Sequence, residues 1–169
     1  MKKFLETERL IIKPPQLSDY ENLHHLHSDP QIMKYFKVNS ATESLESLQK
    51  AIAHFEKYGY SHGLVYKKET FEFVGRGGLI HALYDETQDD IELGYSFLQE
   101  HWGQGYATEL ATALVQWGFT QLSINKIVAH TSFANLASTH VLDKIGMHYV
   151  KPSLYINMET AEYEIYRPK

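Results

Sequence analysis

The middle of the chain carries its clearest strand pattern. Apolar residues alternate with polar or small ones over Ile-Glu-Leu-Gly-Tyr-Ser-Phe, positions 91–97, the period of a β-strand. From about Gln104 to Leu122, apolar residues instead recur every three or four positions, which predicts an amphipathic helix. A buried strand is expected at Lys126–Thr131, and a second helix between a cap at Asn135 and Gly146.

The first half of the chain predicts helices followed by antiparallel strands. A strand is expected over 8–14, ended by two prolines, and the next elements are read from cap residues and apolar spacing. They are helices at 18–27 and 42–58, a short helix from Asp29-Pro30 to Phe36, and strands near 60–68, 72–81, 147–151 and 162–167. This order predicts a mixed α/β or α+β fold in a single domain, residues 1–169.

The segment Trp102-Gly-Gln-Gly-Tyr-Ala107 lies between the central strand and the first long helix. Two glycines allow a tight turn and close approach of a ligand to the backbone. The helix that follows offers unpaired N–H groups and a positive dipole end, so the segment predicts an anion site, most often for phosphate. It is neither a GxxxxGK[ST] P-loop nor a GxGxxG motif, because position 108 is Thr.

Composition excludes several other classes. The chain has no cysteine, which excludes disulfides, a thiolate zinc site and a cysteine nucleophile. Its formal net charge of −5 argues against nucleic acid as a partner. No apolar run approaches the roughly 18 residues of a membrane helix, and no signal-peptide core opens the chain. We therefore expect a cytoplasmic protein with no membrane partner.

Three polar residues are candidates for catalysis. Glu92 lies in the central strand, on the face opposite its apolar neighbours, and is a candidate general base. A solvated strand face is an equally good interpretation. Asn135 and Ser138 stand one helical turn apart at a helix start, where the alternative is an ordinary cap.

Histidines are numerous, with ten in the chain. His24, His25 and His27 cluster on one predicted helix, but no third ligand at a diagnostic spacing accompanies a pair. We interpret them as a solvated helix surface and predict no metal site. His101 directly precedes the glycine segment and is either near a cofactor or an ordinary loop residue. The sequence does not choose which tyrosine, if any, acts in a cleft.

Three long segments together resemble a known family. They are ETERLIIKPPQLSDYENLHHLHSDPQIMKYF, IELGYSFLQEHWGQGYATELATALVQWGF and NKIVAHTSFANLASTHVLDKIGM. They resemble the GNAT acetyl-CoA N-acetyltransferases, in the branch of the ribosomal-protein alanine acetyltransferases (RimJ/RimL-like). The resemblance implies a V-shaped mixed, largely antiparallel sheet flanked by helices, with acetyl-CoA in the gap between two splayed parallel strands.

The resemblance also assigns roles to residues of this chain. The pyrophosphate is expected on Gly103, Gln104, Gly105, Tyr106, Ala107 and Thr108. Phe97 and Leu98 are expected to pair with the pantetheine amides by backbone, and Asn135 to contact the same arm. Ser138 is expected to protonate the leaving thiolate. Trp102 departs from the Arg or Gln usual in the family, at little cost to a loop that acts through its backbone.

The implied function is acetyl-CoA-dependent N-acetylation. With no cysteine for an acyl-enzyme, direct transfer to a primary amine in a ternary complex is expected, with Glu92 as base. A bulged strand N–H near Phe97 is expected to serve the oxyanion. The acceptor is either a protein N-terminal α-amine or a small-molecule amine. A non-catalytic acyl-CoA sensor of the same fold is the alternative, and a homodimer through a C-terminal edge strand stays open.

Overall fold

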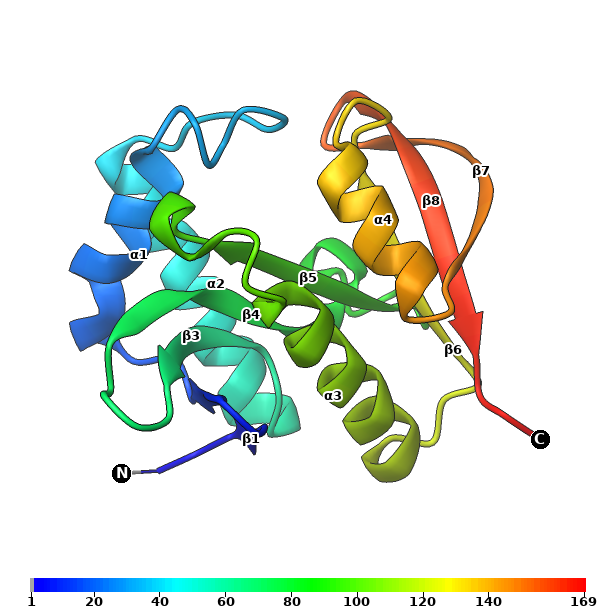
Figure 1. Cartoon of the computed structure of the whole chain (residues 1–169), viewed down its shortest axis with the longest axis horizontal. Helices are drawn as coiled ribbons and strands as arrows, with labels where there is room; N and C mark the ends of the chain where they lie inside the picture. The colour runs from blue at the N-terminus through cyan, green and yellow to red at the C-terminus, as the bar shows by residue number, and fades with distance from the viewer. Residues whose placement is uncertain (1) are drawn as a thin grey trace.

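A mixed eight-stranded sheet runs through the computed structural model, which describes residues 2–169 (Figure 1). The strand order is β1-β2-β3-β4-β5-β6-β8-β7. The strands are β1 Leu5–Glu6, β2 Leu10–Lys13, β3 His62–Lys67, β4 Phe73–His81, β5 Ile91–Phe97, β6 Lys126–Thr131, β7 His148–Tyr155 and β8 Met158–Tyr166. The helices are α1 Tyr20–Ser28, α2 Ala41–Tyr58, α3 Tyr106–Gln121 and α4 Leu136–Lys144.

β5 and β6 form the parallel pair of the sheet, and they separate after a short contact. Their register joins Ile91 to Ile127 and Glu92 to Val128. Beyond these positions β6 continues beside β8 as far as Thr131, and β5 continues beside β4 as far as Phe97. The sheet therefore opens into a V between β5 and β6, as the family resemblance implied.

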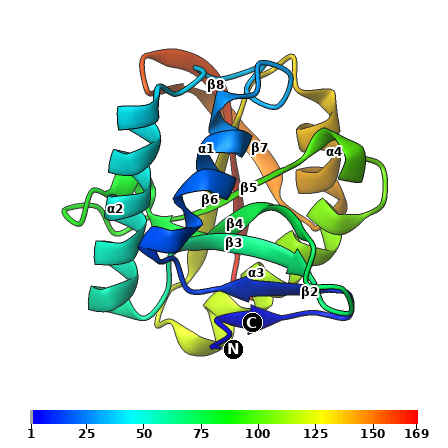
Figure 2. The same cartoon turned by 90° about the vertical axis from the view of Figure 1, so that its left-hand side faces the viewer.

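The helices cover the two faces of the sheet (Figures 1 and 2). Leu64 of β3 packs with Leu23 of α1 and Leu48 of α2 on one face. On the other face, the buried side of α3 joins the main core, and Gly118 lets the helix approach Leu79. Because side chains alternate along a strand, successive residues of β5 point to different helix layers.

The stretch between α1 and α2 is not the predicted short helix. Residues 30–35 form hydrogen-bonded turns, in which the Asp29 carboxylate accepts the N–H groups of Gln31 and Ile32. An aspartate that bonds the backbone just after it favours a turn over a helix. The prediction of a capping Ser18 was also wrong, because α1 begins at Tyr20.

The C-terminal hairpin is longer than predicted. β7 continues through Pro152 to Tyr155, and β8 starts at Met158. Proline is tolerated there because β7 is an edge strand, which does not need every N–H for pairing. The two turn residues, Ile156 and Asn157, have φ of 49° and 60°, the left-handed conformation of tight hairpin turns.

Candidate active site

The glycine segment between β5 and α3 forms an exposed turn. Gly103 and Gly105 have φ of 72° and 80°, a region that favours glycine. Nothing lies within 4 Å of a Cβ built on Gly103, and only an Arg9 nitrogen, at 3.4 Å, lies near one built on Gly105. The turn therefore presents its backbone to the outside without side chains in the way.

The backbone N–H groups of Gly103 to Thr108 donate no hydrogen bond to any described residue of 2–169. The first intrahelical bond of α3 runs from the N–H of Glu109 to the carbonyl of Gly105. A row of unpaired donors at the positive end of a 16-residue helix suits a phosphate group. All six predicted pyrophosphate residues lie together in this row.

Arg9, in the bend between β1 and β2, contacts this turn although it is far away in the sequence. Its Nη1 donates to the carbonyl of Gln104 at 3.0 Å, and its Nε donates to Glu109 Oε2 at 2.6 Å. Its guanidinium also lies 4.6 Å from the centre of the Tyr106 ring, a cation–π contact. Because Arg9 binds the Gln104 carbonyl, it stabilises the turn with its N–H groups facing outward. Sequence reasoning did not identify this residue.

The indole of Trp102 also anchors the turn. Its Nε1 donates to the carbonyl of Phe97 at 2.8 Å, and half of the side chain is exposed (50%). Trp102 thereby takes a structural part at the position where the family usually has Arg or Gln.

The backbone of β5 faces the opening of the V at alternate residues. The N–H of Leu98 donates to the carbonyl of Val74 on β4 at 2.9 Å, so the backbone groups of Ser96 also face β4. Those of Tyr95 and Phe97 then face the opposite side, toward the gap. The N–H of Leu98 has its partner on β4, and its carbonyl accepts from His101. The backbone groups of Leu98 are therefore engaged within the protein, whereas those of Tyr95 and the N–H of Phe97 face the gap.

The bulge expected near Phe97 is absent from the described strands. The register of β4 with β5 runs without a shift from Gly75 opposite Phe97 to His81 opposite Ile91. Ordinary strand alternation, rather than a bulge, directs the N–H groups of Tyr95 and Phe97 toward the gap.

Glu92 is buried at the point where β5 and β6 separate, so the solvated strand face was the wrong interpretation. Only 5% of the residue is exposed. The hydroxyl of Tyr155 donates to Oε1 at 2.6 Å, whereas Oε2 has no partner among residues 2–169. Burial raises the pKa of Glu92 to about 7, against the opposing effect of the Tyr155 hydrogen bond. A carboxyl group with such a pKa can exchange protons near neutral pH.

Asn135 and Ser138 lie at the start of α4, on the other side of the gap. The Asn135 carbonyl oxygen, Oδ1, accepts the Ser138 N–H at 3.2 Å, so the capping interpretation is confirmed. The Ser138 hydroxyl lies 3.2 Å from the Tyr95 hydroxyl, which links α4 to β5. Burial raises the pKa of Tyr95 to about 12, which keeps this hydroxyl protonated. Of the tyrosines that the sequence left open, Tyr95 lies beside Ser138 and Tyr155 bonds Glu92.

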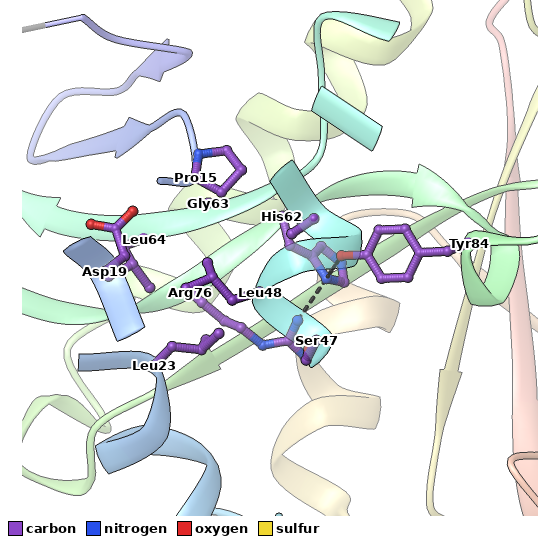
Figure 3. Close-up of a pocket in the computed structure, with 11 residues that line it drawn as sticks. Pro15, Asp19, Leu23, Ser47, Leu48, His62, Gly63, Leu64, Arg76 and Tyr84 are labelled. Carbon is purple, nitrogen blue, oxygen red and sulfur yellow. Dashed lines mark hydrogen bonds between the residues drawn. The ribbon is translucent and has the colours of Figure 1, made fainter. Parts of the chain in front are cut away.

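The opposite face of β5 is lined by polar residues that the sequence did not single out. Arg76 of β4 lies in register opposite Ser96, and its Nη1 donates to Nδ1 of His62 on β3 at 2.6 Å (Figure 3). Beside Tyr155 lies a cavity of about 180 Å³, which is lined in part by Asp90, His130 and Glu162.

The histidine cluster of α1 is not a solvated surface. His25 is exposed, but His27 is buried (3% exposed) and the Nδ1 of His24 bonds the Ser44 hydroxyl at 2.9 Å. Within residues 2–169, no group of three potential ligands is placed to hold a metal ion. His101 is also buried, with its Nε2 3.2 Å from Glu72; it packs under the glycine turn.

Comparison with known proteins decides the family. A model of the acetyltransferase (GNAT) domain matches residues 9–148 of the chain. The chain belongs to the GNAT acetyltransferase family. It is 33% identical over 162 residues to YkkB of Bacillus subtilis (strain 168), a match that covers 95% of this chain and 94% of YkkB.

Solved GNAT structures show the same fold. The acetyltransferase of Agrobacterium tumefaciens str. C58 superposes with a TM-score of 0.85 at 24% identity, over 96% of this chain and 94% of that one. The spermidine N-acetyltransferase of Vibrio cholerae, solved with CoA and spermine, gives 0.75 at 20% identity over 93% and 95%. This chain is accordingly a GNAT N-acetyltransferase, and enzymes of this family use acetyl-CoA. Among residues 2–169, no helix combines the length and apolar character needed to cross a membrane.

Proposed function

We propose that this GNAT enzyme binds acetyl-CoA in the gap between β5 and β6 and transfers the acetyl group directly to a primary amine. The observation that carries the proposal is the row of unpaired N–H groups from Gly103 to Thr108 at the start of α3. These donors suit the pyrophosphate. The gap-facing backbone groups of Tyr95 and the N–H of Phe97 suit the pantetheine amides, as an added strand would use them, whereas the Phe97 carbonyl already accepts from the Trp102 indole. Asn135 lies across the gap, beside the same arm.

Glu92 is the proposed general base. The amine must lose a proton as its nitrogen attacks the thioester carbonyl carbon, since a C–N bond forms while the C–S bond breaks. Glu92 lies on the α1–α2 face at the narrow end of the gap, with one carboxylate oxygen unpartnered. With a pKa of about 7, it is largely ionised above neutral pH and accepts the proton, directly or through one water.

Ser138 and Tyr95 form the proposed proton donor to the departing thiolate. Their hydroxyls are 3.2 Å apart and lie on the α3–α4 side of the sheet, opposite Glu92. A proton passed from the Ser138 hydroxyl to sulfur can be replaced from Tyr95. The gap-facing N–H of Phe97 or Tyr95 is placed to stabilise the oxyanion of the tetrahedral intermediate, a contribution of about 3 kcal/mol for such donors.

The acceptor amine is proposed to enter on the α1–α2 face, because Glu92 points to that side. A protein N-terminal α-amine and a small-molecule amine both meet this requirement. The continuous sheet supports treating residues 1–169 as one catalytic domain.

The proposal is tested by calorimetric titration with acetyl-CoA of the wild-type protein, Gly105→Glu and Gly59→Glu. Gly105 and Gly59 share the left-handed backbone conformation, with φ of 80° and 78°. Gly59 ends α2, with open space around it, so its variant controls for backbone strain and added charge.

Micromolar binding in wild type and Gly59→Glu, weakened about tenfold or more in Gly105→Glu, is the expected result. No binding to the wild-type protein, or equal binding by all three proteins, contradicts the proposed site.

A further inference from the structure

We propose that the acceptor is a primary amine that also carries a carboxylate, and that Arg76 binds this acidic group. The inference rests on the proposed function and names the substrate class of the same site. Arg76 and Ser96 lie opposite each other on β4 and β5, with Leu64 of β3 in the same row. Solvent partly reaches Arg76, Gly94 and Ser96 although they belong to central strands. The His62 ring lies over Gly94, and the Ser96 hydroxyl and Arg76 Nε are buried without partners among residues 2–169. The acceptor is proposed to lie against this part of the α1–α2 face.

Arg76 makes no salt bridge with any carboxylate of residues 2–169. Its guanidinium takes part in none of the salt bridges formed by residues 2–169, and its Nε is buried without a partner. Its one hydrogen bond goes to the Nδ1 of His62 (Figure 3). A partly buried cation without an anion is unfavourable, so this position favours binding of a negative group.

A carboxylate does line the small cavity, of about 10 Å³, that Arg76 borders, but it does not pair with the guanidinium. Asp19 lines that cavity with Arg76, but its Oδ2 accepts the Gln16 N–H at 2.9 Å and its Oδ1 lies 3.9 Å from the Lys13 ammonium. Figure 3 shows the Asp19 carboxylate pointing away from the guanidinium. Asp19 is therefore already engaged, and Arg76 stays unpaired.

The imidazole neighbours of Arg76 are uncharged. Burial lowers the pKa of His27 to about 3 and that of His62 well below its usual range, and the charge of Arg76 lowers both further. Both imidazoles are therefore neutral at pH 7. Glu92 senses the charge of Arg76, which lowers the Glu92 pKa, but its carboxylate makes no salt bridge with the guanidinium among residues 2–169. A planar guanidinium with free donors matches the two oxygens of a carboxylate better than any neutral group.

The amine end of such an acceptor would lie at Glu92 on the same face. On β5 only Gly94 and Ser96 extend this face beyond Glu92 toward Arg76. The Arg76 side chain reaches His62, which lies in register with Gly78 and thus with Gly94. The guanidinium is therefore about two strand positions, about 7 Å, from Glu92 along the strand. One small molecule can span this distance with its amine near Glu92 and its acid near Arg76.

Matched sets of amines test the inference. Each set contains an α- or ω-amino acid, its primary amide and the amine that lacks the acid group, with spermidine as an acid-free reference. Acetylation is measured as release of the CoA thiol. We expect kcat/KM for the acid to exceed that of its amide by tenfold or more, since hydrogen bonds to charged groups contribute about 1.5–3 kcal/mol.

Arg76→Met should raise KM for the acid and remove this preference, so that the acid and its amide react with similar kcat/KM. Arg76→Lys, which keeps the charge but not the planar donors, should restore part of the preference. Lys13→Met is the matched control, because Lys13 is a cation on the same sheet face that already has Asp19 nearby.

Three results overturn the inference: equal or better turnover of the acid-free amines by wild type, no turnover of any acid-bearing amine, or an equal effect of Arg76→Met and Lys13→Met on the preference. The calorimetric titration with acetyl-CoA separates these results from failure of the proposed function. If acetyl-CoA binds at the glycine turn while acid-bearing amines are inert, the cofactor site stands and only the substrate class is refuted.

Discussion

Replacement of Glu92 by glutamine should make the folded protein less sensitive to pH. The carboxyl pKa is 4.5 in an exposed reference and about 7 in the folded protein. Between these values the unfolded chain has lost the proton and the folded protein has kept it, so wild-type stability falls as the pH rises. Each pKa unit corresponds to about 1.4 kcal/mol. Between pH 4 and 8, wild type should therefore lose about 3 kcal/mol of unfolding free energy relative to Glu92→Gln.

Urea unfolding of both proteins at several pH values measures this difference. Glu46→Gln is a suitable control, because Glu46 is an exposed carboxyl on α2 and its loss should leave the pH dependence unchanged. If wild type and Glu92→Gln keep a constant difference in unfolding free energy from pH 4 to 8, the carboxyl is not held with a raised pKa and the reasoning is refuted.

The same substitution tests the proposed catalytic base. In wild type, kcat/KM should rise with pH and level off above about 7, where Glu92 is ionised. In Glu92→Gln, kcat/KM above this pH should fall about a hundredfold or more, and its rise with pH near 7 should disappear. Tyr155→Phe removes the hydrogen bond that lowers the pKa of Glu92, so it should shift the rise of kcat/KM to higher pH. An unchanged profile in Glu92→Gln would remove Glu92 from the mechanism.

Three further predictions concern the loop, the sheet and the proton donor. Arg9→Met should raise the calorimetric Kd for acetyl-CoA about tenfold, because the turn loses the guanidinium that binds its carbonyl; an unaltered Kd would argue against this role. Gly78→Ala should lower the unfolding free energy measured with urea by about 1–3 kcal/mol, because a Cβ there would lie 2.0 Å from the carbonyl oxygen of Ser61. A urea midpoint equal to that of the wild type would contradict this close packing. Tyr95→Phe and Ser138→Ala should each lower kcat, and a double-mutant cycle should show coupling of about 1 kcal/mol between them. Additive effects of the two substitutions would show that the two hydroxyls do not act together.

Local sequence signals were sufficient for the elements that surround the gap. The alternation at 91–97 predicted β5, and the glycine turn followed by apolar residues at helical spacing predicted α3. The end of α2 near Gly59 was also predicted from a local signal, whereas the helix is capped by Ser40 rather than opening at the predicted position 42. Such signals need only neighbours within a few positions, so they are readable without the fold.

The contacts that complete the site join distant parts of the chain. Arg9 and Glu109 are 100 residues apart, Glu92 and Tyr155 are 63 apart, and Tyr95 and Ser138 are 43 apart. No local pattern marks these partners. The burial of Glu92 was equally invisible, because alternation shows which face a residue lies on but not whether another element covers that face.

Strand alternation along β5 separates the two groups that we propose for the proton transfers. Glu92 points to the α1–α2 face, and Tyr95, three positions on, points to the α3–α4 face toward Ser138. If the acetyl group lies in the gap between β5 and β6, the amine approaches from one face while the thiolate leaves on the other. Base and proton donor then cannot neutralise each other directly, because the strand lies between them. In the proposed mechanism, this separation lets a carboxyl with a pKa of about 7 and a protonated tyrosine serve one reaction at the same pH.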